Sequence, residues 1–435
     1  MTDFLPTQPY KGSRDFYPED KRVHDFIFAK CREVVQRYGY REYDGPILEP
    51  FELYAAKSGE EIVNTQLYSF TDRGDRRVAI RPEMTPTLAR MVAAKFQELP
   101  KPIRWFSVPN LWRYERPQRG RLREHWQLNV DLLGGDRGLA DLEIVQIAVA
   151  LLSNFGAPKQ SFEIRVNHRG LVDALFREEL KLEPAAALKL VKLVDAKAKM
   201  KPEAYAAGLL ALGLDEKAQA RLDAFFALRL ENLASEFPGP ASAELGTLLQ
   251  TLGDLGLSEA VRLDTTIMRG LDYYTGLVFE AFDLNPENNR ALFGGGRYDN
   301  LIGLFGKQSL SGVGFGMGDV TLRNFLEGHR LLPEFSSFAD VFVTCPSRNE
   351  LEAALAISAE LRGAGLRVVD ALSFEGFGAQ LKSAAKQGCV FAVLLGEDEI
   401  RRGVLAVKDL RSGQQFEVER GGLAGRLQQS LRPAL

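Results

Sequence analysis

Five arginines crowd into about a dozen residues of the first third of the chain. They are Arg113, Arg116, Arg119, Arg121 and Arg123. A guanidinium group presents a planar fork of donors, which suits bidentate binding of phosphate oxygens. Glu115, Gln127 and Asp131 lie in the same stretch and could orient a cationic or amide-bearing group. The stretch therefore predicts a nucleotide site, and the alternative is a solvated hairpin with surface ion pairs.

The segments on either side of the arginine cluster alternate apolar and polar residues. The incoming segment contains Ile103 and Trp105, and the outgoing one has an apolar residue at every second position over 126–132. This alternation is typical of half-buried strands, and Pro117 and Gly120 interrupt it. We therefore expect an antiparallel pair of strands, with the arginines on the sheet and its loop.

A second polar cluster lies at a corner between a predicted strand and a predicted helix. A hairpin is predicted over 66–81, with its turn at 72–75, and an apolar-periodic helix follows through 88–96. Glu83 and Thr85 lie between the two. Helix capping by Thr85 is the alternative to a ligand-binding role, because threonine is favoured at N-caps.

Glycines are dense in two later stretches, GGG at 294–296 and GVGFGMG at 312–318. Such density indicates that the backbone approaches a ligand or another strand closely, because any Cβ atom would intrude. The dinucleotide spacing G-x-G-x-x-G is absent, since Met317 and Asp319 stand where its third glycine would be. The P-loop spacing G-x-x-x-x-G-K-[ST] is absent as well, so Rossmann dehydrogenases and P-loop kinases are both disfavoured.

The composition is that of an ordinary globular protein. The 435 residues are 45% hydrophobic and 26% charged, and this length suggests about two to four domains. The net charge of -3 excludes a generally polycationic nucleic-acid coat. The three cysteines and four histidines lack metal-ligand spacing, so we expect no zinc and no disulfides. Since no apolar run approaches ~18 residues, we expect a cytoplasmic protein without a membrane segment.

The order of predicted elements indicates several domains. An amphipathic helix is predicted from Pro18 to Gly39, and the extended segment 40–50 contains prolines that confine it to an edge or an interface. A buried helix over 142–152 precedes an all-helical block at 171–257, which suggests an insertion between sheet elements. Strand patterns resume at Val261. A small α/β domain is then predicted from about residue 337, with strands at 339–345, 366–370 and 389–396 and helices at 350–362 and 376–386.

These stretches resemble, in order, those of histidyl-tRNA synthetases, a family of class II aminoacyl-tRNA synthetases. GPILEP at 45–50 is similar to motif 1, and the arginine-rich stretch 113–131 is similar to motif 2. RPEMT at 81–85 and RGLDYYTGLVFE at 269–280 resemble the histidine-binding signatures. GGGRYDNL and GVGFGMG resemble the approach to motif 3, so the resemblance covers essentially the whole chain.

The resemblance implies an α+β fold with a class II antiparallel catalytic sheet of six or seven strands and a C-terminal α/β anticodon-binding domain. It divides the chain into catalytic parts at 1–170 and 259–335, a helical insertion at 171–258 and the anticodon-binding domain at 336–435. It also implies a histidine–tRNA ligase that uses ATP with Mg²⁺, L-histidine and tRNA-His. The expected assembly is a homodimer, with no DNA partner.

The resemblance further assigns roles to individual residues. Arg113 and Arg269 would hold the α-phosphate of ATP from opposite sides and act as catalytic residues, while Glu115 meets the adenine and Arg121 completes the ATP site. Histidine would be bound by a second group of side chains. Its α-ammonium would meet Glu83 and Gln127 beside Met84 and Thr85, and its imidazole would meet Asp131 and Tyr274 beside Tyr273.

Two positions depart from the family pattern. Thr321 stands where motif 3 usually has an arginine for the γ-phosphate end of ATP, and Arg323 is expected on another helix face. ATP should therefore depend more on Arg121 and magnesium. Asp131 replaces a frequent glutamate, which keeps the acceptor on a shorter side chain.

Two alternatives from other classes remain. The first is a catalytically inactive paralogue that binds histidine as the regulatory subunit of ATP phosphoribosyltransferase. Such paralogues typically lack the C-terminal domain and the motif 2 arginines, whereas this chain has both. The second is another nucleotide-binding regulator, which would have no reason to preserve RGLDYYTG.

Overall fold

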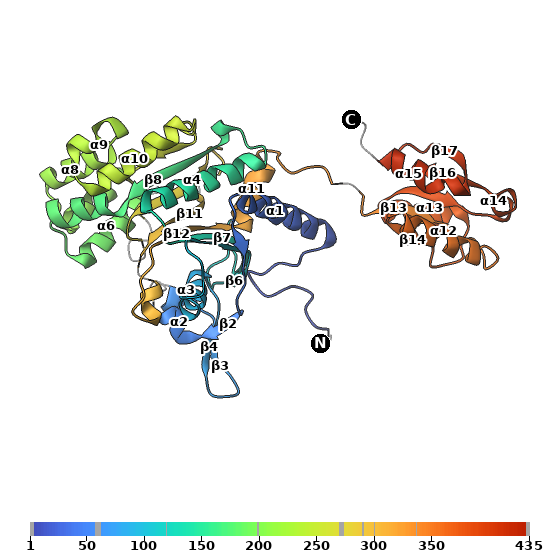
Figure 1. Ribbon diagram of the computed structural model, residues 1–435, viewed down its shortest axis with the longest axis horizontal. Coiled ribbons are helices and arrows are strands. Elements are labelled where there is room, and N and C mark those ends of the chain that lie inside the picture. Colours follow the sequence, from blue (N-terminus) through green and yellow to red (C-terminus); the bar gives the residue numbers. More distant parts are fainter. Residues whose placement is uncertain are drawn as a thin grey trace. The chain divides into compact units, whose positions relative to one another are not determined.

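The computed structural model describes residues 4–56, 62–118, 120–197, 200–268, 274–288, 291–299, 301–335 and 337–431. The chain forms two compact units, Met1–Leu332 and Pro333–Leu435, which Figure 1 colours from blue to orange and from orange to red. Each unit has its own core. The finer division into four segments remains a prediction.

The first unit is built on a nine-stranded sheet in the order β1-β5-β7-β12-β11-β10-β8-β9, with β6 paired to β7. Every pair between β5 and β8 is antiparallel, while β1 and β9 add in parallel at the ends. The antiparallel sheet is as predicted, with additional strands at its edges. The strands are β1 Arg41–Glu42, β5 Ile103–Ser107, β6 Asn110–Trp112, β7 Glu124–Leu133, β8 Phe162–His168, β9 Val261–Leu263, β10 Leu277–Asp283, β11 Ala291–Tyr298 and β12 Gly312–Gly318.

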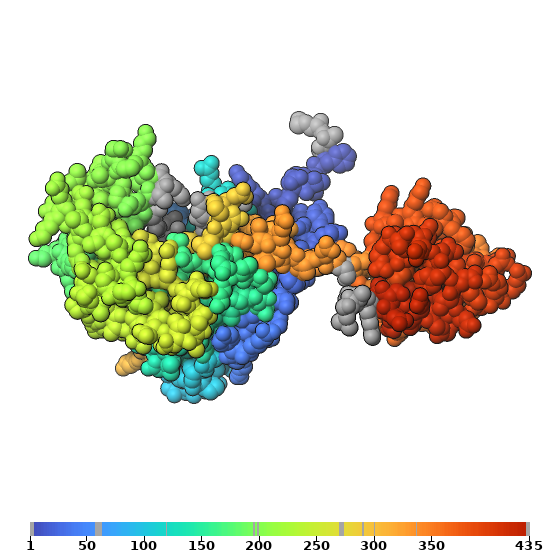
Figure 2. Space-filling view, turned by 90° about the horizontal axis from the view of Figure 1, so that it is seen from above, coloured from blue at the N-terminus to red at the C-terminus, as the bar shows by residue number. Residues whose placement is uncertain are grey.

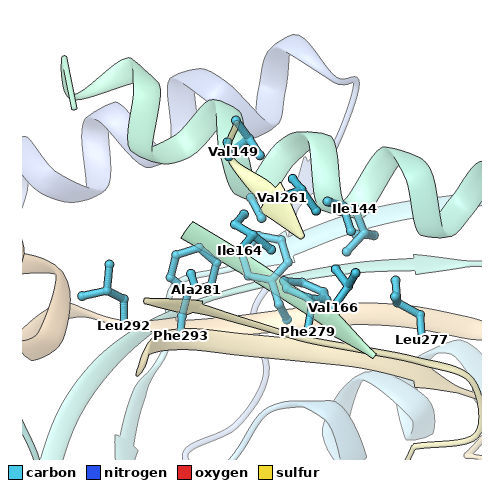
Figure 3. Packing of buried hydrophobic residues seen from close by; sticks show 14 of the residues in the cluster. Ile144, Val149, Ile164, Val166, Val261, Leu277, Phe279, Ala281, Leu292 and Phe293 are labelled. Atoms are coloured by element: carbon cyan, nitrogen blue, oxygen red, sulfur yellow. The ribbon is translucent and has the colours of Figure 1, made fainter. Parts of the chain in front are cut away.

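Helices cover both faces of this sheet. On one face, α1 (Pro18–Arg37), α4 (Arg137–Asn154) and α11 (Asp319–Gly328) bury the main hydrophobic core (Figure 1). Figure 3 shows side chains of α4, β8, β9, β10 and β11 packed together in this core. On the other face, α3 (Thr85–Ala94) packs on a smaller cluster that includes Leu133 and Tyr298.

A small sheet lies beside α3. Its order is β2-β4-β3, and it contains the predicted hairpin over β3 and β4. Its elements are β2 Leu48–Pro50, α2 Phe51–Ala55, β3 Ser69–Thr71 and β4 Arg77–Ile80. Short π and 3-10 turns elsewhere in the chain are Ile62–Gln66, Lys159–Ser161, Ala174–Glu179, Ile302–Phe305 and Arg420–Gly422.

The predicted all-helical block is present between β8 and β9. Its buried leucines and Phe225 join the same core as the central sheet, and in the space-filling view it covers one side of the first unit in green and yellow (Figure 2). Its helices are α5 Arg169–Asp173, α6 Pro184–Ala196, α7 Pro202–Ala211, α8 Glu216–Phe226, α9 Leu230–Glu236 and α10 Pro240–Asp254.

The second unit is the expected small α/β fold. Its five strands follow the order β14-β13-β15-β16-β17, of which the first three are parallel. The strands are β13 Ala339–Val343, β14 Val368–Asp370, β15 Cys389–Leu394, β16 Val404–Asp409 and β17 Gln415–Glu419. The helices are α12 Leu351–Gly363, α13 Phe377–Lys386, α14 Glu397–Arg402 and α15 Leu423–Leu431. Across the described residues of both units, no helix has the length and apolar character needed to span a bilayer.

Candidate active site

One face of the central sheet is covered with glycines where β11 and β12 meet. Val313, Phe315 and Met317 of β12 belong to the main core, and alternate residues of a strand point to opposite faces. Gly314 and Gly316 therefore lie on the face away from that core. The register pairs Gly314 with Asp131 and Gly318 with Gln127, so these two polar side chains of β7 share the glycine face.

The glycines make room for the predicted histidine-binding side chains. A Cβ atom on Gly316 would lie 2.7 Å from Cδ of Gln127, and one on Gly296 would lie 2.9 Å from Cδ1 of Tyr274. Both distances are shorter than a carbon–carbon contact allows. The predicted close approach to another strand is present as well, because a Cβ atom on Gly295 would lie 2.2 Å from the carbonyl oxygen of Gly314 and one on Gly314 would lie 2.5 Å from that of Val130.

Asp131 is buried on this face, with 4% of its surface exposed. Its carboxylate accepts a hydrogen bond from the Tyr298 hydroxyl. Burial raises the pKa of Asp131 to about 7, and the hydrogen bond from Tyr298 opposes that rise. The group can therefore change its charge near neutral pH, which suits a partner for a ring nitrogen of imidazole.

Tyr274 and Glu83 lie near Asp131. The pKa of Tyr274 is raised, first by burial and then by the carboxylates of Glu83, Asp131 and Glu280. Such interactions require these groups to be close together. Gly296 and Gly314 are paired in the sheet, and Cβ atoms on them would meet Tyr274 and Asp131, so motif 2 and the histidine signature meet on the glycine face, although they are far apart in the sequence.

The capping role considered for Thr85 is not what the structure shows. Thr85 is the first residue of α3, Met84 occupies the N-cap position, and no side chain caps the helix. Proline suits the first turn because its missing N–H would have no partner there, and Pro86 lies in that turn. Thr85 is partly exposed and Met84 is fully buried.

A cavity of about 320 Å³ adjoins the glycine face and contains the predicted ATP-binding residues Arg113, Glu115 and Arg121. Gly318 also lines it and pairs with Gln127, so the cavity begins where the histidine-binding face ends. A volume of this size is at the lower end for small-molecule sites.

The arginines were predicted on the sheet and its loop, and the structure places all the described arginines of motif 2 in the loop between β6 and β7. Trp112 ends β6 and Glu124 begins β7. The backbone N–H of Arg113 donates to the carbonyl of Arg123 at 2.8 Å, so the connection closes as a loop. Gly120, with a φ of 79°, turns the chain inside it. Pro117 also prevents a continuous ladder there.

Internal contacts orient the side chains of this loop. Nε of Arg113 donates to the carbonyl of Pro82 at 2.9 Å, which places the guanidinium beside the RPEMT segment. Glu115 and Arg121 form an ion pair at 3.7 Å across the cavity. The described lining of the cavity thus includes two guanidinium groups, Arg113 and Arg121, and two carboxylates, Glu115 and Asp319.

Thr321 lines the same cavity, but its hydroxyl is hydrogen-bonded to the main chain. It donates to the carbonyl of Leu292 at 2.7 Å. Arg323 forms ion pairs with Asp20 at 2.9 Å and Glu327 at 2.7 Å and is not among the cavity residues. The predicted separation of Arg323 from this site is therefore confirmed.

Two further cavity residues, His125 and Asp319, were not predicted from the sequence. Burial lowers the pKa of His125 to about 3, helped by the charges of Arg113 and Arg14, so its ring is neutral at physiological pH. His125 precedes Gln127 by two residues on β7. The period of a strand was the sequence signal that could have identified it.

Two predicted residues, Arg269 and Tyr273, lie outside the described residues. Within the described ranges, no three histidine, cysteine, aspartate or glutamate side chains form a group that could hold a metal ion.

Comparison with known proteins identifies the family. Residues 12–320 match the family model for histidyl-tRNA synthetase, and residues 340–430 match the one for an anticodon binding domain. The chain belongs to the histidyl-tRNA synthetase family. This confirms the family predicted from the motifs and the presence of the C-terminal domain in this synthetase.

Relatives of this synthetase match over nearly their whole length. It is 47% identical to the histidine–tRNA ligase of Leptospira biflexa over 95% of each chain. It is 40% identical to that of Opitutus terrae, over 95% of this chain and 96% of the relative.

Solved structures confirm the predicted fold. The synthetase is similar to the histidyl-tRNA synthetase of Nostoc sp. PCC 7120, with a TM-score of 0.82 and 24% identity over 98% of this chain and all of the other. It is also similar to an ATP phosphoribosyltransferase regulatory subunit/histidyl-tRNA synthetase from Bacillus halodurans C, with a TM-score of 0.74 and 24% identity over 91% and 99% of the chains. At this identity the two similarities establish the fold alone.

Proposed function

We propose that this synthetase is a histidine–tRNA ligase, which activates L-histidine with ATP and transfers it to the 3′ end of tRNA-His. The observation that carries the proposal is the meeting of Asp131 and Tyr274 on the glycine face, beside a cavity whose Arg113 bonds to Pro82, the residue before Glu83. This arrangement offers carboxylates and a phenol for an amino acid and guanidinium groups for a phosphate.

Histidine would bind on the glycine face. Its α-ammonium would interact with Glu83 and the amide of Gln127, with Met84 and Thr85 alongside. Its imidazole would bind between Asp131 and Tyr274, beside Tyr273. A pocket whose polar groups pair with both ring nitrogens rejects analogues without them by about 10⁴ to 10⁵, because its own groups would be left unpaired.

ATP would bind as its magnesium complex in the cavity. Arg113 would hold the α-phosphate, Glu115 would accept from the adenine amino group, and Arg121 would contribute to triphosphate binding. A carboxylate oxygen of histidine attacks the α-phosphorus as the bond to pyrophosphate breaks. Charge then builds on the phosphate oxygens, where Arg113 and, from the opposite side, Arg269 would stabilise it.

The remaining proposals concern tRNA, assembly and location, and they rest on the domain content and on the family resemblance. The second unit would bind the anticodon region of tRNA-His, in keeping with its match to anticodon binding domains. The synthetase would act as a homodimer in the cytoplasm. The 2′- or 3′-hydroxyl of the terminal ribose would then take the histidyl group from the adenylate and release AMP.

The regulatory paralogue is the other function we considered. The similarity to the Bacillus halodurans protein concerns the fold only, at 24% identity. Arg113 and Arg121 both line the cavity, and a protein that only senses histidine has no need for such phosphate-binding groups. These observations favour the ligase.

The deciding experiment is exchange of labelled pyrophosphate into ATP by the purified full chain. We expect exchange only when L-histidine is supplied, and we expect Arg113→Ala to abolish it. Arg323→Ala is a matched control because its ion pairs lie away from the cavity. Histidine binding without exchange in a folded protein would instead support the regulatory function.

A further inference from the structure

Among the described residues, the part of the cavity wall at position 321 has no cationic side chain. Thr321 occupies it, and the proton of its hydroxyl is given to the carbonyl of Leu292. ATP has several negative charges near neutral pH, and phosphate oxygens bound in protein cavities require charged or N–H donors. A donor from elsewhere in the chain is therefore expected at this wall.

The N-terminal segment lies against the end of the loop between β6 and β7, and other residues of this loop line the cavity. The carbonyl of Gly12 accepts from the N–H groups of Arg123 at 2.9 Å and Glu124 at 3.1 Å. The side chain of Arg123 also donates to the Tyr10 hydroxyl at 3.0 Å. These contacts hold the segment at the start of β7, close to His125.

Arg14 of this segment is not itself among the lining residues, but it bonds to Asp319, which lines the cavity near Thr321. Its Nη2 donates to Oδ2 of Asp319 at 2.6 Å, and Asp319 lines the cavity. The other oxygen of Asp319 accepts from the N–H of Trp126 at 3.1 Å, which fixes the carboxylate. The charge of Arg14 also helps to lower the pKa of His125, which is another residue of the cavity lining.

The guanidinium of Arg14 retains donors for a ligand. It has five N–H groups, of which one bonds to Asp319, and its buried Nε has no hydrogen-bond partner among the described residues. A buried donor without a partner is costly. The three remaining Nη–H groups are the donors that phosphate oxygens could accept from.

We propose that Arg14 binds the pyrophosphate end of ATP and supplies the guanidinium that position 321 lacks. Asp319 acts as a positioning residue that holds Arg14 against the cavity wall. The proposal rests on the proposed function for the location of ATP. It assigns a substrate contact to a residue more than 300 positions away from Thr321 in the sequence.

The first test compares ligands with and without the terminal phosphates. Arg14→Ala should raise the KM for ATP and, in the reverse reaction, the KM for pyrophosphate by roughly tenfold or more, as expected for loss of a charge-assisted hydrogen bond. The KM for histidine and the affinity for AMP should change little. Arg323→Ala should leave all four values unchanged. If Arg14→Ala weakened the binding of ATP and of AMP by the same factor, the proposal would be wrong.

A double variant separates direct binding from neutralisation of Asp319. If Arg14 only neutralises that carboxylate, Arg14→Ala combined with Asp319→Asn should restore the native KM for ATP, and the proposal is wrong. If Arg14 contacts the phosphates, the double variant should stay impaired. Thr321→Arg should then recover part of the lost ATP affinity in the Arg14→Ala background.

The same question can be answered without catalysis. Calorimetric titration of the native chain and Arg14→Ala with ATP and with AMP measures the two affinities directly. A selective loss of ATP affinity supports the Arg14 contact even if the chain showed no pyrophosphate exchange. The proposed function and this contact can thus fail independently.

Discussion

Tyr298 and Asp131 form a hydrogen bond across a strand that separates them. Tyr298 lies on β11 and Asp131 on β7, with β12 between the two. The contact is possible because β12 has glycine at this place, and a Cβ atom on Gly312 would lie 2.5 Å from the Tyr298 ring. Because β12 has glycine here, Tyr298 can position Asp131, a candidate histidine-binding residue two strands away.

Replacing Tyr298 by phenylalanine should weaken histidine binding in a pH-dependent way. The hydrogen bond from Tyr298 lowers the pKa of Asp131, which burial has raised to about 7. Without it the pKa rises further, so less carboxylate is available at pH 7. The KM for histidine in pyrophosphate exchange should rise roughly tenfold at pH 7, and the difference should narrow by pH 9. The KM for ATP is the internal control, and a parallel rise in it would indicate general disruption.

Asp131 should also affect how stability depends on pH. Its folded pKa of about 7 exceeds the ordinary value, so the folded state binds more protons between about pH 4 and pH 7. The contribution of Asp131 to stability is therefore present at low pH and is lost as the pH rises through 7. Asp131→Asn removes this titration, so the variant should gain stability relative to the native chain from pH 5 to pH 8, on the order of 2 to 4 kcal/mol. The Tm difference at the two pH values measures it, and a constant difference would contradict the prediction.

Thr275 should position its neighbour Tyr274. The hydroxyl of Thr275 donates to Asp299 at 2.7 Å and its N–H donates to the carbonyl of Arg297 at 2.7 Å. Asp299 is itself held by Arg137 at 2.8 Å. Thr275→Val removes the hydroxyl bond at almost constant volume, so the KM for histidine should rise by about fivefold or more while the KM for ATP stays the same.

Thr275→Ser is the matched control for that variant, because it retains the hydroxyl. Serine should restore the native KM for histidine. If both variants behave alike, the methyl packing of Thr275 matters and the bond to Asp299 does not.

Arg121 and Thr321 should contribute unequally to ATP binding. Arg121 lines the cavity and is half exposed, paired only loosely with Glu115 at 3.7 Å. Arg121→Ala should raise the KM for ATP by about tenfold or more, because a guanidinium that can reach phosphate oxygens is lost. Thr321→Ala should change the KM for ATP by less than about threefold, since the hydroxyl is hydrogen-bonded to the carbonyl of Leu292. Comparable damage from both variants would refute this account of the cavity.

Removing the second unit should affect histidine activation much less than the charging of tRNA. Residues 333–435 form a compact unit with its own core, and none of the candidate histidine or ATP residues lies there. Pyrophosphate exchange should stay within about an order of magnitude of the native rate, while charging of tRNA falls far more because remote binding energy is lost. Light scattering on the same preparation checks the assembly. Equal loss of both activities in an intact assembly would show that this unit helps to build the active site.

Local pattern was sufficient for most elements of the fold. The apolar spacing of 18–39 predicted α1, the composition of 171–257 predicted the helical block, and GVGFGMG coincides with β12. Such patterns depend on residues a few positions apart, and they are visible in a single chain. The strand β8 was not predicted, although Phe162, Ile164 and Val166 alternate as a half-buried strand does.

The candidate site was predicted less directly. The arginine cluster and the glycine stretches indicated a nucleotide site by their chemistry, but the role of each residue came from the family resemblance. Periodicity predicted a strand, a loop and a strand, but not that all the described arginines lie in the loop, since β6 ends at Trp112 and β7 begins only at Glu124.

Sequence alone determined the family, the order of elements and the residues able to perform the chemistry. Only the tertiary structure decided which of them meet. Tyr298 and Asp131 are 167 positions apart and Arg14 and Asp319 are 305 apart. Their contacts depend on strand order, on register and on the side chains missing from the strand between them, and a one-residue shift in register would turn Asp131 to the opposite face of the sheet.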